Sequence, residues 1–100
     1  MPHYRLTSAA ADDVVTILEN GIEQFGVDPA ARYRDGLVAA FVLLAEYPRA
    51  ARIRDDLPRS VRVHRYRSHV IIYRMQDDGS VLIAGVCHGR EDRQADLTSH

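Results

Sequence analysis

The sequence predicts a single α+β domain made of an N-terminal strand, an antiparallel helical hairpin and then a three-stranded antiparallel sheet. Three observations predict this fold. The chain has 100 residues, which is the size of one domain. Two stretches in its first half repeat apolar residues at the three- and four-residue spacing of a helix. Three runs in its second half are rich in β-branched residues and are separated by short turns, as strands are.

The first element is a strand at residues 4–7, where polar and apolar side chains alternate. Thr7 or Ser8 offers a hydroxyl that can cap the helix that follows. We expect this helix over about residues 9–25, with Gly26 as the residue that ends it. Its apolar stripe is predicted to be Val14, Leu18, Ile22 and Phe25.

The second helix is expected to begin at Asp28-Pro29, because Asp is a favourable cap and Pro fits the first helical position. Pro48 disfavours helical backbone in the residue before it, so the helix should end near Tyr47. A link of about three residues then joins the two helices, and so short a link makes them antiparallel. The apolar stripe of the second helix is predicted to be Tyr33, Leu37, Phe41 and Leu44.

The three later strands are expected at residues 61–66, 70–75 and 81–87. The Asp-Gly pair at residues 78–79 is typical of a tight turn between two strands. Residues 49–60 are interpreted as an irregular connection. We expect the first strand to join this sheet as an additional strand, the domain to span residues 1–97, and residues 98–100 to be a frayed tail.

Charge is distributed unevenly along the chain. The net charge is −1, which disfavours a strongly basic nucleic-acid-binding protein. Residues 49–74, however, hold eight Arg against two acidic residues, whereas the segments before and after them are acidic. A cationic sheet surface suits an acidic partner or a phosphate backbone, although charge along an edge strand also protects that strand from aggregation. No apolar stretch is long enough to span a membrane and Cys87 stands alone, so we expect a cytoplasmic protein with no membrane contact.

The segment after the last predicted strand, His88-Gly-Arg-Glu-Asp-Arg93, gathers groups that could perform acid–base chemistry on RNA. The alternative, which we favour, is a chain exit in which Arg and carboxylate groups pair on the surface. His64, His69 and His88 fit no metal-binding spacing. The sequence also contains no nucleophile triad, phosphate-binding loop or dinucleotide fingerprint. The residues therefore predict no metal, no cofactor and no catalytic group.

The order of the elements and several short motifs together resemble the RelE/ParE superfamily of bacterial type II toxins, and within it the ParE branch. The resemblance rests on Tyr47-Pro48 at the end of the second helix, on His69-Val-Ile-Ile-Tyr73, and on His88-Gly-Arg-Glu-Asp92 after the last strand. It spans nearly the whole chain. Members of the RelE branch are strongly basic ribonucleases, and here the chain departs from them: its net charge is −1, it has no Lys, and Gly89 follows His88 where an aromatic residue would help.

The resemblance implies a toxin that inhibits DNA gyrase by binding and catalyses no reaction itself. The alternative is a ribosome-dependent mRNA endoribonuclease of the RelE type. The resemblance also implies a hetero-oligomer with a cognate ribbon-helix-helix antitoxin (ParD-like), through which alone the toxin would meet DNA. The acidic, amphipathic tail of such an antitoxin is expected to contact Tyr47, Arg62, Arg65 and Arg74. The target-binding surface is expected to consist of His88, Arg90, Asp92 and Arg93.

Overall fold

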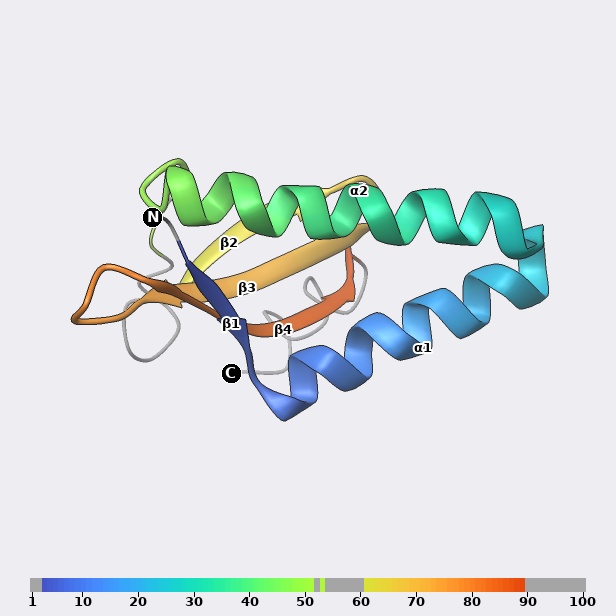
Figure 1. Cartoon of the computed structure of the whole chain (residues 1–100), viewed down its shortest axis with the longest axis horizontal. Coiled ribbons are helices and arrows are strands. Elements are labelled where there is room, and N and C mark those ends of the chain that lie inside the picture. Colours follow the sequence, from blue (N-terminus) through green and yellow to red (C-terminus); the bar gives the residue numbers. More distant parts are fainter. Residues whose placement is uncertain (1–2, 52, 54–60, 90–100) are drawn as a thin grey trace.

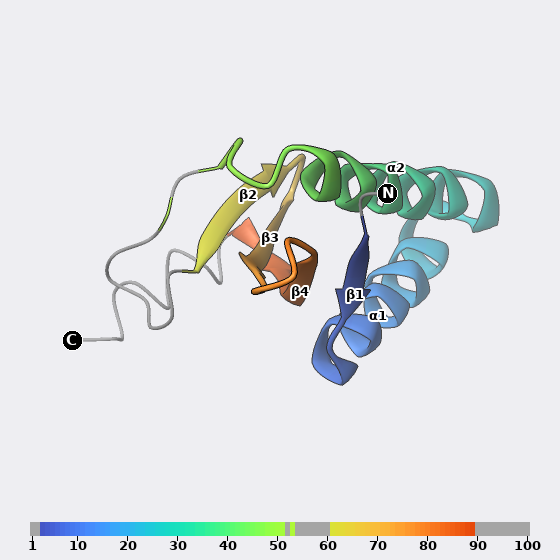
Figure 2. The same cartoon turned by 60° about the vertical axis from the view of Figure 1, so that its left-hand side comes forward.

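The computed structural model describes residues 3–51, 53 and 61–89. Its elements follow the predicted order of one strand, two helices and three strands. They are β1 (Tyr4–Leu6), α1 (Ser8–Phe25), α2 (Val27–Glu46), β2 (Arg62–Tyr66), β3 (His69–Met75) and β4 (Val81–His88). The two helices form a hairpin that covers one face of the sheet, as Figure 1 and Figure 2 show from two directions.

The sheet has four strands in the order β1-β4-β3-β2. The last three strands form the expected antiparallel sheet. β1 joins this sheet, as expected, and runs parallel to β4, with Tyr4 opposite Val81 and Leu6 opposite Ile83. β2 lies at the other edge of the described sheet, where Ile53 makes an isolated antiparallel bridge to Arg62.

The helix boundaries follow from local sequence, with one correction. Thr7 caps α1, because its Oγ1 accepts a hydrogen bond from the Ala10 N–H at 3.0 Å. Gly26 ends α1 with a φ of 93°, a left-handed conformation that favours glycine. The expected three-residue link with Asp28 as a cap is wrong, because Gly26 alone separates the helices and Asp28 lies in the first turn of α2. α2 ends at the residue before Tyr47, as predicted.

A β-bulge in β4 is held by two side chains from the beginning of α1. The register between β3 and β4 shifts at Ile72–Tyr73, which leaves Ala84 without a partner across the strand. Thr7 Oγ1 donates to the Ala84 carbonyl oxygen at 2.9 Å. Asp13 Oδ2 accepts from the Val86 N–H at 2.9 Å. The polar groups that the bulge removes from the ladder therefore find partners on α1.

The hydrophobic core lies between α2 and the sheet. Its largest fully buried side chains are Leu37, Phe41, Leu44, Ile71, Tyr73, Val81 and Ile83. The predicted stripe of α2 supplies three of them, and the alternating residues of β3 and β4 supply the rest. The Tyr73 hydroxyl donates to the Pro48 carbonyl oxygen at 2.8 Å, so the one polar atom of this side chain is satisfied inside the core.

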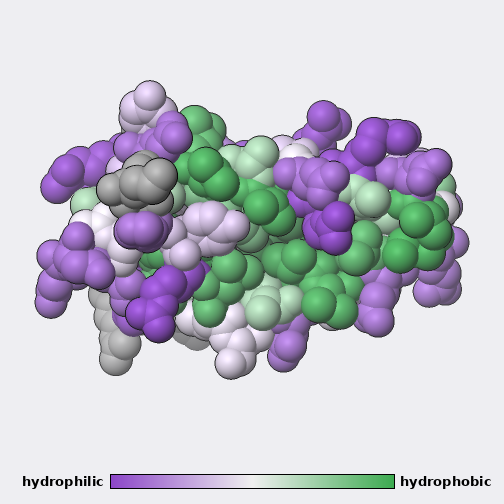
Figure 3. All heavy atoms as spheres, in the orientation of Figure 1, coloured by the Kyte–Doolittle hydropathy of each residue, from purple (hydrophilic) through white to green (hydrophobic). Residues whose placement is uncertain are grey.

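The apolar stripe predicted for α1 is buried only in its first half. Val14 packs against the core, whereas Ile22 and Phe25 are 38% and 69% exposed. The reason is that the closed end of the hairpin extends beyond the described strands (Figure 1). Figure 3, in the same orientation as Figure 1, shows the result: a band of apolar side chains crosses the visible face of the molecule and reaches the closed end of the hairpin.

Several expectations concern residues outside those described. They are the frayed tail at 98–100, the domain boundary at 97 and most of the connection at 49–60. Among the residues described, no helix combines the length and the apolar character that crossing a membrane requires.

Candidate functional site

The sheet divides the expected antitoxin-binding arginines between its two faces. Arg62 pairs in register with the core residue Tyr73 and therefore faces the helices. Arg65 and Arg74 lie at odd spacing from these two residues along the same strands, so they occupy the face turned away from the helices. The structure does not bring the three arginines together on one surface.

Arg62 makes its contact within the protein. Its Nη1 donates to the Ala51 carbonyl oxygen at 2.6 Å. Tyr73, its cross-strand neighbour, binds the Pro48 carbonyl oxygen in the same way. The two side chains thus fasten the segment after α2 to the sheet, which gives Arg62 a structural role that the sequence did not indicate.

The face turned away from the helices carries arginines on both sides of an aliphatic strip. Arg5 and Arg74 flank Leu82, with which each is in register. On the same face, the Val63–Ile72 pair links β2 to β3, and Arg65 lies two residues after Val63 along β2. We call Arg5, Arg65 and Arg74 the arginine face. The first of them was missed by the sequence analysis, although its place between two apolar residues of an alternating strand could have predicted it.

Arg65 lies at the beginning of the expected target-binding segment. A Cβ atom added at Gly89 would meet Nη1 and Nη2 of Arg65 at 2.8 and 2.9 Å, so the guanidinium group lies directly over this glycine. The Gly89 N–H donates to the Ser68 carbonyl oxygen at 2.9 Å. The chain is therefore fixed against the turn between β2 and β3 at the point where the target-binding segment begins.

The other expected site residues are dispersed. Tyr47 is 60% exposed at the end of α2, in the helical layer and apart from the arginine face. His88 ends β4 and is exposed. Arg90, Asp92 and Arg93 lie outside the described residues.

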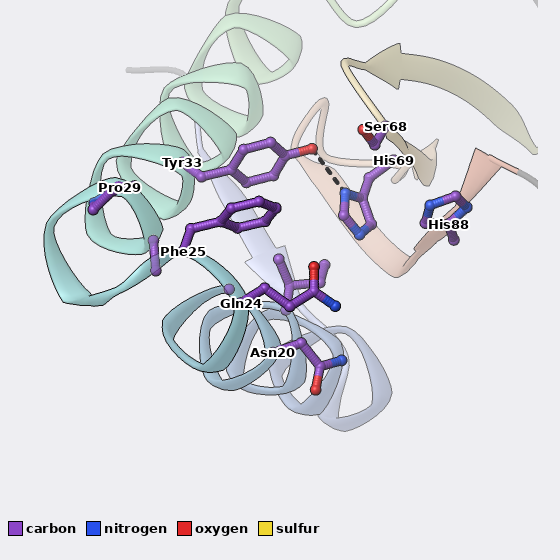
Figure 4. Close-up of a pocket in the computed structure, with 11 residues that line it drawn as sticks. Asn20, Gln24, Phe25, Pro29, Tyr33, Ser68, His69 and His88 are labelled. Carbon is purple, nitrogen blue, oxygen red and sulfur yellow. Dashed lines mark hydrogen bonds between the residues drawn. The ribbon is translucent and has the colours of Figure 1, made fainter.

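On the helix side of the sheet, His88 lines a cavity of about 500 Å³. The cavity lies between the closed end of the hairpin and the beginning of β3 (Figure 4). Tyr33 reaches from α2 to His69, and its hydroxyl oxygen is 2.8 Å from His69 Nδ1. The rings of His69 and His88 contact each other with centroids 5.5 Å apart. Asn20 and Gln24 project from α1 on the facing side (Figure 4).

The aromatic cluster around the cavity is fixed by edge-to-face ring contacts. The Tyr33 ring centroid lies 5.4 Å from that of Tyr66 and 5.5 Å from that of His69. Burial raises the pKa of Tyr33 above its ordinary value of 10.0, so its hydroxyl stays protonated at neutral pH. Tyr33 was predicted as a core residue of the second helix. The sequence contains no signal that pairs it with His69, because the two residues lie 36 positions apart.

The described lining of the cavity combines aromatic, amide and imidazole side chains. None of the described side chains that line it is an arginine. Within the part of the chain that the structure describes, no three His, Cys, Asp or Glu side chains are grouped so as to hold a metal ion.

Solved structures with this fold include toxin–antitoxin proteins. A chain from the chromosomal ParDE TA system of P. aeruginosa matches with a TM-score of 0.73 at 18% identity, over 88% of this chain and 96% of that one. A chain from the toxin-antitoxin complex RelBE2 of Mycobacterium tuberculosis matches with a TM-score of 0.61 at 24% identity, over 88% of this chain and 99% of that one. The fold is therefore that of the RelE/ParE toxins.

Sequence comparison identifies the branch. The family described as ParE toxin of type II toxin-antitoxin system, parDE, matches residues 4–93, and the chain belongs to this family. Toxin ParE1 of Mycobacterium tuberculosis is 30% identical over 94 residues, which cover 94% of this chain and 96% of that protein, in strain CDC 1551 / Oshkosh. The same values hold for Toxin ParE1 of strain ATCC 25618 / H37Rv. The protein is thus a type II toxin, as its motifs implied.

Proposed function

We propose that this toxin inhibits DNA gyrase by binding to it in the cytoplasm, and that a ribbon-helix-helix antitoxin of the ParD type neutralises it. The observation that carries the proposal is that Arg65 covers Gly89, where the target-binding segment begins. A partner bound over Arg65 therefore lies beside Gly89, within the segment that we assign to the target. In this proposal the antitoxin and the target compete for this end of the sheet, and such competition is what neutralisation requires.

The arginine face suits an acidic amphipathic helix. A helix with its side chains is about 10–12 Å wide and strands lie about 4.8 Å apart, so one helix covers two or three strands. Val63, Ile72 and Leu82 offer apolar contact along the middle of the face. Arg74 on one side of this strip and Arg65 on the other can each pair with a carboxylate of the helix.

The two remaining antitoxin-binding residues take different roles in this proposal. Tyr47 contacts the antitoxin as a separate exposed aromatic residue on the helical layer, where a partner that wraps the toxin would meet it. Arg62 acts indirectly, because its guanidinium group holds the Ala51 carbonyl oxygen and with it the segment beside the edge strand.

Charge reversal on the arginine face tests the antitoxin proposal. Arg65→Glu with Arg74→Glu should weaken antitoxin binding at least about tenfold at physiological salt, because attraction becomes repulsion at two positions. Arg34→Glu is the matched control, since Arg34 belongs to α2 and pairs with Asp35 at 3.0 Å. Isothermal titration calorimetry provides the affinities. Equal affinity for the double variant and the control contradicts the assignment.

A gyrase assay tests the target. Purified toxin added to gyrase and supercoiled plasmid should accumulate cleaved DNA, and an equimolar amount of antitoxin should prevent this. Replacing His88, Arg90, Asp92 and Arg93 together by Ala in the full chain should abolish the cleaved product while antitoxin binding to Arg65 and Arg74 remains. Gyrase that works normally at saturating toxin refutes the proposal.

A second candidate function is cleavage of mRNA on the ribosome. The observation in its favour is the contact between His69 and His88, because two imidazoles can serve as a general base and a general acid. Translating ribosomes incubated with the toxin then yield shortened transcripts, and His88→Ala removes this activity. We rank this function second because the chain has a net charge of −1 and no Lys, whereas binding to ribosomal RNA favours a strongly basic protein.

A further inference from the structure

The cavity beneath the closed end of the hairpin has a lining that, apart from His88, lies outside the residues assigned to gyrase and to the antitoxin. It is about 500 Å³, within the range of small-molecule sites. Four segments build it: the second half of α1 and the first turns of α2, which adjoin in sequence, together with the start of β3 and the end of β4. Figure 4 shows their side chains converging on one space.

The walls of this cavity combine a flat apolar side with an amide-lined side. Phe25, which is 69% exposed, and Tyr33 extend into it from the hairpin in the same direction (Figure 4). Asn20 and Gln24 are four residues apart and therefore lie on one face of α1. Each amide can donate and accept hydrogen bonds in one plane. A planar heteroaromatic ring needs this combination of an aromatic face and in-plane partners.

The charge distribution around the cavity is as distinctive as its walls. Its described lining contains no Arg, Lys, Asp or Glu. A second hollow adjoins it and shares Pro29 and Tyr33 with it, and this hollow is lined by the guanidinium-bearing residues Arg32 and Arg67. The described lining of the cavity thus differs from that of the adjoining hollow, which carries two guanidinium groups.

Arg67 occupies a backbone conformation that its side chain disfavours. Its φ is 51°, in the left-handed region, which costs a non-glycine residue roughly 1–2 kcal/mol. The guanidinium carbon lies 5.8 Å from the centroid of the Tyr66 ring, within the range of a cation–π contact. The turn therefore holds a cation at the rim of the hollow at a position where glycine would fit with less strain.

We propose that these two compartments, the cavity and the adjoining hollow, together bind one nucleotide. The base enters the cavity, contacts Phe25 and Tyr33, and bonds through its edge to Asn20 and Gln24. The phosphate lies between Arg32 and Arg67 in the adjoining hollow. The nucleotide is either a free mononucleotide or an unpaired residue of a single-stranded nucleic acid, since both present the same base and phosphate. This binding goes beyond gyrase inhibition, although His88 belongs to the lining of the cavity and to the surface assigned to the target.

An aromatic side chain of a protein partner matches the site less well. A Phe or Tyr ring would fill the apolar side but would leave the ring-edge hydrogen bonds of the two amides unused. It would also bring no negative charge to Arg32 and Arg67. Arg32 and Arg67 line the adjoining hollow and the two imidazoles line the cavity, so the proposal assigns the phosphate to the arginines and the base to the cavity.

Titration of the full-length toxin with defined probes tests the proposal. The probes are the four ribonucleoside 5′-monophosphates, adenosine, inorganic phosphate and a fluorescein-labelled single-stranded oligodeoxynucleotide. The side-chain amide resonances of Asn20 and Gln24 should shift with a monophosphate. Phe25→Ala should weaken binding at least about fivefold through lost stacking, and Arg32→Gln with Arg67→Gln about tenfold through lost charged hydrogen bonds.

Arg34→Gln is the control for Arg32→Gln, because each removes one positive charge from α2 and Arg34 lies outside the linings of both compartments. It should change affinity less than about twofold, in line with screening of exposed charges. Each variant must retain the thermal transition of the parent. Tighter binding of the oligodeoxynucleotide than of any monophosphate identifies a nucleic acid as the ligand, whereas equal binding identifies the free nucleotide.

Three results would overturn the proposal. The first is that neither monophosphate nor oligodeoxynucleotide moves the two amide resonances. The second is that Arg34→Gln weakens binding as much as the Arg32 and Arg67 substitutions do, or that inorganic phosphate binds as tightly as the monophosphates. The third is that Phe25→Ala leaves nucleotide affinity unchanged but weakens a complex with antitoxin or gyrase, which would assign the cavity to a protein side chain.

Discussion

Asp13 holds the β-bulge of β4, and its replacement measures how much that bulge depends on α1. β1 pairs with β4 only at residues 81–83, so beyond this point the edge of β4 faces α1 rather than a strand. Val86, which is 4% exposed, donates its N–H to Asp13 Oδ2 at 2.9 Å across this edge. Asp13→Ala leaves a buried N–H without its carboxylate partner. A hydrogen bond to a charged group contributes about 1.5–3 kcal/mol, so we expect a loss of about 2 kcal/mol.

Urea denaturation and thermal unfolding of three variants check this value. A loss of about 2 kcal/mol corresponds to a fall in Tm of about 10 °C for a domain of this size. Asp12→Ala is the control, because Asp12 is exposed and its substitution removes the same charge from the same part of the helix. This control should change the free energy of unfolding by less than about 0.5 kcal/mol. Asp13→Asn keeps a carbonyl oxygen and should fall between the two. Equal stability of Asp13→Ala and Asp12→Ala would refute the role of this hydrogen bond.

Three further predictions concern the core and the contact between α2 and β2. Leu37→Ala, at a fully buried position, should lower the free energy of unfolding by about 2–5 kcal/mol in urea; a loss under 1 kcal/mol would contradict its place in the core. Gly36→Ala should lower the free energy of unfolding by about 1 kcal/mol in the same assay, because the new Cβ would collide with the Tyr66 hydroxyl. This is the net loss after the gain of about 1 kcal/mol that Ala brings in helix propensity. Tyr66→Phe should recover part of the loss, because it removes the hydroxyl. Tyr73→Phe should cost about 1 kcal/mol at pH 7 through the lost bond to Pro48. Burial raises the pKa of Tyr73 above 10.0, so above pH 10 the hydroxyl ionises more readily in the unfolded chain than in the folded one. The parent therefore loses stability as the pH rises past 10, whereas Tyr73→Phe loses less. A difference in stability between the two proteins that does not narrow above pH 10 would contradict this dependence.

The elements of this fold could be predicted where short-range chemistry determines them. Gly26 ends a helix because it alone adopts a left-handed φ at low cost, and Pro48 ends the next one by restricting the residue before it. The expected start of the second helix at Asp28 was wrong because the sequence offers two adjacent signals, Gly26 and Asp28-Pro29, where a helix can begin. The structure uses the earlier one, so the connection between the helices is shorter than predicted.

The site was less predictable because long-range pairing builds it. Alternation along β2 places Arg62 and Arg65 on opposite faces of the sheet, but both faces of that strand carry cations, so the sequence could not show which face the helices cover. The cavity depends on the packing of α1 and α2 against the ends of β3 and β4. The residue spacing of Asn20, Tyr33 and His69 contains no periodic signal for such an arrangement.

The pairing of β1 with β4 also affects the order in which this domain folds during synthesis. Residues 4–6 are synthesised well before their neighbours at 81–83, which follow 77 residues later in the chain. Contacts so far apart in the chain form late, because closure of the intervening loop costs entropy that only the finished pairing repays. The growing chain therefore holds β1 without its strand partner until β4 has been made, and the four-stranded sheet closes only then.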